Sequence, residues 1–229
     1  MPSSTGDARL AHVRWIGGGS GAGKSTVARR LADTHGLRVY SCDATISEHG
    51  RRSDPTRHPL LHSFMAMDMD QRWVTRPPEV MERTFPWFRG EAFEMIVDDL
   101  LRLPLDPPVL VEGFRLLPRL VAPLVGRQPR AVWLLPTPDF RISAFDRRGF
   151  TWEIPGRTGD PPRALANLLD RDRLFTDQVA EEAAALGLPV VHVDGELGVE
   201  ALTERTAKLL GLTTRAGDRP GPRSTSSPA

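Results

Sequence analysis

The stretch Gly18-Gly19-Ser20-Gly21-Ala22-Gly23-Lys24-Ser25-Thr26 decides the fold of this chain. It fits G-x-x-x-x-G-K-[ST], the pattern of the phosphate-binding P-loop. In such a loop, glycines let backbone N–H groups surround a polyphosphate, and the next helix points its positive end at the same anion. We expect these nine residues to bind nucleotide, Lys24 to reach the β- and γ-phosphates, and the Ser25 hydroxyl to ligate Mg²⁺.

The residues around this loop supply the context that the motif needs. Residues 12–16 are typical of a short strand, and Val27, Ala28 and Leu31 follow the loop at helical spacing. The alternative is a flexible Gly/Ser turn. The chain has only two lysines, Lys24 and Lys208, which argues against a chance match to the Gly-Lys-Ser core.

Composition places the chain among ordinary soluble globular proteins. Of its 229 residues, 40% are hydrophobic and 26% are charged. A net charge of +1 gives no basis for nucleic-acid or anionic-membrane binding, and no apolar run is long enough to span a membrane. The single cysteine, Cys42, excludes an internal disulfide and suits a reducing compartment. We therefore expect a cytoplasmic protein without nucleic-acid or membrane partners; its oligomeric state is not predicted.

Apolar segments, separated by glycines and prolines that end helices and strands, divide the chain into secondary-structure elements. Strands are expected at 37–42, 109–111, 131–135 and 190–193, alternating with helices, which predicts a parallel sheet between two helical layers. Residues 44–107 form a helical insertion, and the glycine-rich residues 149–160 a mobile loop before a long helix at 161–186. Residues 1–9 and 213–229 have the composition of disordered tails, so we expect one domain over residues 10–212.

These features resemble the P-loop small-molecule kinases: nucleoside and nucleotide kinases, shikimate and gluconate kinases, and chloramphenicol phosphotransferases. The resemblance rests on the P-loop, Asp43 after the second strand, the VLVEG and VVHVDG segments, and an arginine-rich region at 147–173. It implies a five-stranded sheet in the order 2-3-1-4-5, an α/β/α sandwich, a lid over ATP, and an acceptor site built from residues 44–107. The insertion matches no single member, so the resemblance does not identify the acceptor.

Two acids and an arginine follow strands whose carboxyl ends face the expected crevice. Asp43 is expected to orient the attacking hydroxyl and to take its proton, the alternative being an N-cap for a helix at 44–47. Glu112 is expected to orient Mg²⁺ through water or to contact the acceptor, the alternative being a structural carboxylate before Gly113. Arg115 is expected in the acceptor pocket, with a surface salt bridge as its alternative.

Arginines near the 149–160 loop are candidates for stabilising the charge that develops during phosphoryl transfer. We expect at least one of Arg147, Arg148, Arg171 and Arg173 to reach phosphate, and select Arg147 and Arg171. The alternative is a solvated helix face on which these arginines pair with Asp170 and Asp172.

The insertion also mixes aromatic and charged residues. Arg72, Trp73 and Trp87 are expected to contact a ring-bearing or sugar-like acceptor. The alternative is that the tryptophans only pack the insertion.

The sequence favours an ATP-dependent phosphotransferase that moves the γ-phosphate to a hydroxyl or phosphate of a nucleoside, a nucleotide or an antibiotic-like metabolite. A GTPase would need an N-K-x-D box, but the only asparagine, Asn167, precedes Leu168. No LSGGQ-like segment supports an ABC-type ATPase. A regulatory nucleotide-binding ATPase without transfer activity stays open.

Overall fold

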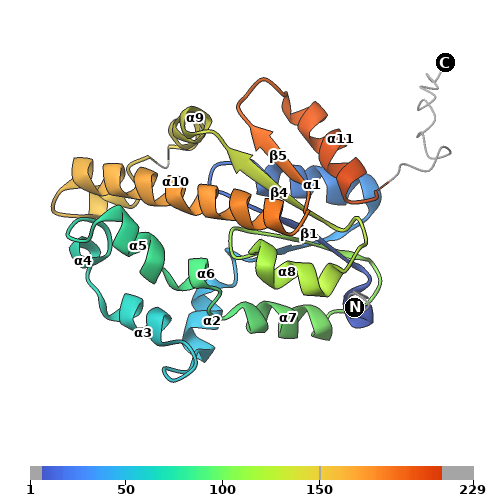
Figure 1. The fold of residues 1–229 in the computed structure, drawn as a ribbon, viewed down its shortest axis with the longest axis horizontal. Helices are drawn as coiled ribbons and strands as arrows, with labels where there is room; N and C mark the ends of the chain where they lie inside the picture. The colour runs from blue at the N-terminus through green and yellow to red at the C-terminus, as the bar shows by residue number, and fades with distance from the viewer. Residues whose placement is uncertain (1–6, 150, 213–229) are drawn as a thin grey trace, which may run out of the picture.

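The five strands of the computed structural model form one parallel sheet (Figure 1). The structure describes residues 7–149 and 151–212. The strands are β1 (Val13–Gly18), β2 (Arg38–Ser41), β3 (Val109–Glu112), β4 (Ala131–Pro136) and β5 (Val190–Val193). Their order is β2-β3-β1-β4-β5, which confirms the expected 2-3-1-4-5 arrangement.

Helices cover both faces of the sheet, as expected for an α/β/α sandwich. On one face, α1 (Lys24–His35) and α11 (Val199–Leu209) pack against side chains such as Ile16, Leu110 and Val132. The alternate strand positions Trp15, Val111 and Trp133 face the other way. There they meet α7 (Phe93–Arg102), α8 (Pro118–Val125) and α10 (Pro161–Ala185).

The insertion after β2 is helical, as predicted. Its helices are α2 (Ile46–Arg52), α3 (Pro59–Ala66), α4 (Met69–Trp73), α5 (Pro78–Thr84), α6 (Pro86–Arg89) and α7. Prolines begin α3, α5 and α6, where a missing N–H costs nothing. Asp68 and Gln71 form a capping box at the start of α4. Figure 1 shows α4 and α5 beside the N-terminal half of α10, which both contact, and α3 below them.

The remaining segments connect these layers. Helix α9 (Pro138–Arg148) ends at Gly149, and the 149–160 loop contains a 3-10 helix at Pro155–Arg157. Another 3-10 helix, Ala8–Leu10, overlaps the segment expected as an N-terminal tail, and the Asp7 amide donates to the Leu124 carbonyl. The rest of the expected tails, 1–6 and 213–229, lies outside the described residues. No described helix is both long and apolar enough to cross a membrane.

Candidate active site

The P-loop joins the end of β1 to the start of α1, at the carboxyl edge of the sheet. Gly18 has φ +121°, and a Cβ there would lie 2.0 Å from the Leu134 carbonyl oxygen. A Cβ on Gly19 would lie 2.8 Å from the Thr176 hydroxyl oxygen. Only glycine fits this close approach, and Gly23, with φ +82°, then turns the chain into the helix.

The start of α1 fits a polyphosphate. The first amides of any helix have no partner within it, and Gly23 brings no side-chain cap. An anion there would meet N–H donors and the positive end of the helix dipole. Lys24 is largely buried beside the loop, where its Nζ donates to the Gly19 carbonyl at 2.7 Å. Its ammonium group therefore already lies next to the expected phosphates.

A buried carboxylate connects the P-loop to β2 and β3. Glu112 is 2% exposed and accepts hydrogen bonds from the hydroxyls of Ser25, at 3.1 Å, and Ser41, at 2.7 Å. Hydroxyl and carboxylate oxygens are the hard ligands that Mg²⁺ prefers. Ser25 and Glu112 are therefore residues that could hold Mg²⁺.

Asp43 follows β2 and does not cap the next helix. Helix α2 starts at Ile46 with Thr45 as its N-cap, so the capping alternative is wrong. Although the Asp43 side chain is open to a cavity, the protein atoms around it raise the pKa of its carboxyl. Lys24 lowers that pKa and the negative charge of Glu112 raises it.

The cavity beside Asp43 has a volume of about 510 Å³ and a mainly aromatic wall. It opens onto the P-loop at Ser20. Its other lining residues come from the insertion, the 149–160 loop, α9, α10 and the segment after β3. They are Asp43, Ile46, Phe64, Trp73, Phe85, Trp87, Phe88, Phe114, Phe145, Thr151, Glu153, Ile154, Pro155, Leu165, Leu168, Leu169, Arg171 and Asp172. We call this the aromatic cavity.

Trp73 and Trp87 pack the insertion and also line the cavity, while their contact with an acceptor stays a prediction. They are 7% and 8% exposed, and they pack edge-on against other rings, Trp73 with Phe64 at 5.5 Å and Trp87 with Phe85 at 4.9 Å between centroids. Both also line the aromatic cavity. The tryptophans thus build the insertion's core and the wall of the cavity at once.

Arg171 lies in the wall of the aromatic cavity, buried among rings. Its guanidinium lies 4.5 Å from the centroid of Phe85 and 5.0 Å from that of Trp73, and pairs with Asp172 at 2.6 Å. Its Nη1 and the indole Nε1 of Trp87 are buried without a hydrogen-bond acceptor among the described residues. Contact between Arg171 and a transferred phosphate stays a prediction.

Arg147 lies at a second cavity, on the helical side of the P-loop. This cavity of about 610 Å³ is lined by Ala22, Gly23, Thr26 and Val27, by one side of α9 and by the segment after β5. The Arg147 guanidinium lies 5.5 Å from the centroid of the Phe140 ring. This position suits contact with the base or sugar of a nucleotide; its expected contact with phosphate stays a prediction.

The structure does not place Arg72 or Arg115 among the residues that line the aromatic cavity. Arg72 donates from Nε to the Phe64 carbonyl and from Nη2 to the Met65 carbonyl. Arg115 is 1% exposed and donates from Nη2 to the Ala92 carbonyl at 2.9 Å. Both guanidinium groups donate to backbone carbonyls, and their expected contact with the acceptor stays a prediction. Burial overturns the surface alternative for Arg115.

Arg173 follows the solvated-face alternative, since it is exposed and pairs with Asp177 at 3.2 Å. The side chain of Arg148 lies outside the described residues.

Sequence reasoning missed Arg141, which is buried and donates from Nε to the Ser20 carbonyl at 3.3 Å and from Nη2 to the Thr176 hydroxyl. Its only sequence signal is its helical spacing from Phe145, which lines the aromatic cavity.

The 149–160 loop covers the aromatic cavity. Thr151, Glu153, Ile154 and Pro155 line it, and the Gly159 amide donates to the Asp70 carboxylate at 2.7 Å. This contact ties the end of the loop to α4 in the insertion. Closure of the loop over ATP, as first expected, stays a prediction.

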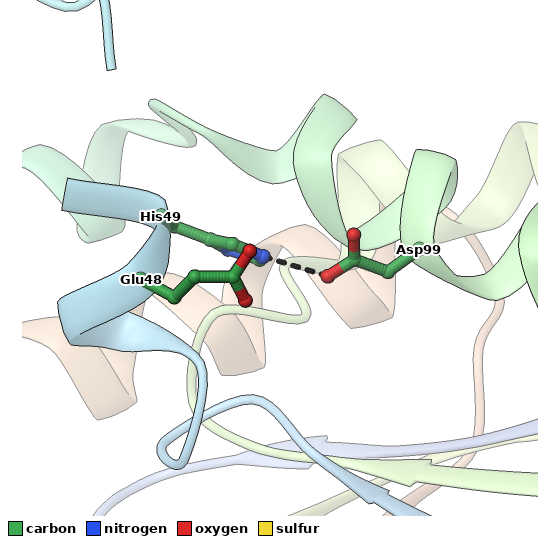
Figure 2. Close-up of side chains that lie close together, drawn as sticks. All are labelled: Glu48, His49 and Asp99. Atoms are coloured by element: carbon green, nitrogen blue, oxygen red, sulfur yellow. Dashed lines mark hydrogen bonds and ion pairs between the residues drawn. The ribbon is translucent and has the colours of Figure 1, made fainter. Parts of the chain in front are cut away.

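Figure 2 shows a separate cluster of Glu48, His49 and Asp99 between α2 and α7. His49 Nε2 lies 2.8 Å from Asp99 Oδ2, which also accepts from the Tyr40 hydroxyl at 2.7 Å. The Arg52 guanidinium pairs with the Glu48 carboxylate at 2.9 Å and with the Asp99 carboxylate at 3.3 Å. Because a cation already bridges the acids, we interpret the cluster as a polar tie that fixes α2 to α7.

The structure resembles solved structures of low sequence identity. Deoxyadenosine kinase from M. mycoides, whose structure holds dATP, is 14% identical, with a TM-score of 0.48 over 87% of this chain and 99% of that one. TT1252 from Thermus thermophilus is 18% identical, with a TM-score of 0.47 over 88% and 98%. An uncharacterized protein from Eubacterium ventriosum is 15% identical, with a TM-score of 0.41 over 87% and 97%.

No family model matches the sequence, and no curated protein matches it. The fold is nevertheless that of the P-loop kinases. The sheet order and the loop between β1 and α1 show it.

Proposed function

We propose that this protein is an ATP-dependent phosphotransferase that moves the γ-phosphate to a hydroxyl or phosphate of a small molecule. The observation that carries the proposal is the aromatic cavity, whose wall includes Ser20 of the P-loop and Asp43, a carboxyl whose pKa is raised by the protein atoms around it and lowered by the nearby Lys24. A ligand in this cavity has its reactive group beside the expected phosphates.

Four polar side chains in and beside the P-loop would have roles in this reaction. Lys24 would bind the β- and γ-phosphates, and Ser25 with Glu112 would hold Mg²⁺. Bound Mg²⁺ neutralises charge on the phosphate oxygens. Asp43 would hold the acceptor hydroxyl in line and take its proton late, because the transition state is loose. The rings and the 149–160 loop would exclude water from the acceptor.

Label transfer from γ-labelled ATP tests the proposal. The purified chain is incubated with Mg²⁺ and pools of nucleosides, nucleotides, sugars and aryl alcohols, and the labelled products are separated. We expect label in one class of acceptor, dependent on Mg²⁺. Lys24→Ala should abolish the transfer with the fold retained. Near-wild-type turnover of Lys24→Ala would contradict the P-loop assignment.

The alternative, a regulatory ATPase, predicts a different outcome from the same experiment. Label would then appear only as inorganic phosphate, whatever acceptor is present.

A further inference from the structure

The aromatic cavity is built for an apolar ligand body. Thirteen of its nineteen lining side chains are apolar, and they include the rings of Phe64, Trp73, Phe85, Trp87 and Phe88. These rings come from α3, α4, α6 and the residue between α5 and α6. Burying carbon against such walls is favourable, while a polar group placed there must find a hydrogen-bond partner.

Arg171 is the only cationic residue among the described residues that line the cavity, and its Nη1 is the one guanidinium nitrogen without a hydrogen-bond acceptor among them. Arg171 is 6% exposed, and both its Nε and its Nη2 donate to Asp172 Oδ1, at 3.0 and 2.6 Å. The net charge of the Arg171 and Asp172 pair is therefore close to zero. Recognition of a phosphate-bearing acceptor needs arginines or lysines whose charge is not already committed.

The other charged lining residues are acids. Asp43 lies at the P-loop end, with Ser20, and Glu153 lies in the 149–160 loop. An anionic acceptor would be repelled by both. Asp43 and Glu153 would attract a cationic acceptor, but the rings of Trp73, Phe85 and Phe88 give it little stabilisation, because the Arg171 guanidinium already lies over them and is paired with Asp172.

We infer that the acceptor is an uncharged alcohol carried on an apolar ring system, and that the cavity rejects acceptors that bear phosphate. The inference rests on the proposed function in that it calls the ligand of this cavity the phosphoryl acceptor. Its hydroxyl lies at the Ser20 and Asp43 end, and its ring lies among the aromatic side chains.

Calorimetric titration of the full chain, without ATP, tests the selectivity. The probes are naphthylethanol, its phosphate monoester, an amino-naphthylethanol that carries an ammonium group, and thymidine. Naphthylethanol should bind in a saturable way. Its phosphate monoester should bind at least about tenfold more weakly, from repulsion by the two acids at close range. The ammonium probe and thymidine should also bind more weakly than naphthylethanol.

A matched pair of variants locates the binding. Ile154→Glu adds a carboxylate at a lining position that is 37% exposed, and should weaken naphthylethanol binding about fivefold. Ile142→Glu adds the same group at a position that is 41% exposed on α9 and does not line the cavity, so it should leave binding unchanged. Equal effects of the two variants would place the ligand elsewhere and overturn the inference.

Three other results would also overturn it: no binding of naphthylethanol, binding of the phosphate monoester or the ammonium probe as tight as that of naphthylethanol, or tighter binding of thymidine. The titration is independent of the label-transfer experiment. Transfer of label to a nucleotide would preserve the proposed function and refute this inference. Selective binding of naphthylethanol without transfer to any acceptor would refute the proposed function and leave standing only the selectivity of the cavity for uncharged ring-bearing ligands.

Discussion

Asp43 combines an open position at the end of β2 with an environment that disfavours its charge. The atoms packed around the carboxyl raise its pKa above the ordinary value of 3.8. A base must be ionised to take a proton, so the rate should fall as the pH drops through this raised pKa. We expect Asp43→Asn to lower kcat by roughly 10²-fold and to remove this acid limb, as for loss of a general base. Rate measurements from acid to neutral pH check both.

The affinity for ATP is the control for Asp43→Asn. It should barely change, because Asp43 is expected to contact the acceptor rather than the phosphates. Weaker ATP–Mg²⁺ binding with kcat spared would instead make Asp43 part of the metal shell, and Glu112 would be the next candidate for the base.

Glu112 makes a different prediction, because its oxygens are bonded to Ser25 and Ser41 rather than open to the aromatic cavity. Glu112→Gln keeps the size of the side chain and removes its charge. We expect the Mg²⁺ concentration needed for half-maximal rate to rise about tenfold, within the range for loss of a metal's supporting carboxylate. Titration of activity with Mg²⁺ measures this. An unchanged Mg²⁺ requirement would leave Glu112 with a structural role only.

At the scale of elements, the tie between α2 and α7 should depend on pH. Burial lowers the pKa of His49 below its ordinary value of 6.5; Arg115 and Arg52 act in the same direction, and Asp99 against it. In the unfolded chain the His49 imidazole takes up a proton as the pH falls through 6.5. In the folded chain it stays neutral to a lower pH, because its pKa is lower. The free energy of unfolding should therefore be highest above pH 6.5 and fall below it. Denaturant unfolding from pH 8 to pH 5 checks this.

Two variants isolate the contribution of His49 from that of other groups. His12 also has a lowered pKa, through burial, and adds a slope of the same sign. His49→Gln keeps a donor for Asp99 but does not titrate, so it should flatten the dependence between pH 7 and 5. His192→Gln changes an exposed imidazole and should leave the slope as it is. Equal slopes for wild type and His49→Gln would refute the account.

The 149–160 loop is the second element with a testable role. Because it lines the aromatic cavity and is tied to α4 by the Gly159 and Asp70 contact, we expect the acceptor to stabilise it more than nucleotide does. Backbone hydrogen exchange in this loop should slow when naphthylethanol binds, and change less with an ATP analogue alone. If the ATP analogue alone slows hydrogen exchange in this loop, the loop acts as a lid over ATP.

At the scale of the whole molecule, much of the fold follows from the chain's apolar segments and from the glycines and prolines between them. The P-loop pattern, the apolar strands such as Val109–Glu112, and the prolines that start helices are local signals, and the structure confirms the elements they predict. The strand order came from the resemblance to P-loop kinases, because local pattern alone does not give the order of parallel strands.

The acceptor side could be predicted only in part. Spacing does not say which way a long side chain turns, so Arg115 was placed in a pocket although its guanidinium is buried against backbone carbonyls. Arg141 carries no motif, and its contact with Ser20 depends on how α9 packs against the P-loop. The aromatic cavity draws its wall from segments between Ser20 and Asp172, so only the tertiary structure assembles it.

The fate of the γ-phosphate tests the central claim most directly. With saturating ATP and Mg²⁺, the label is partitioned between the acceptor and inorganic phosphate as the acceptor concentration is raised. The account predicts that ADP release rises with acceptor and that each ADP formed is matched by one phosphorylated acceptor. Release of inorganic phosphate at a rate that no acceptor changes would contradict it.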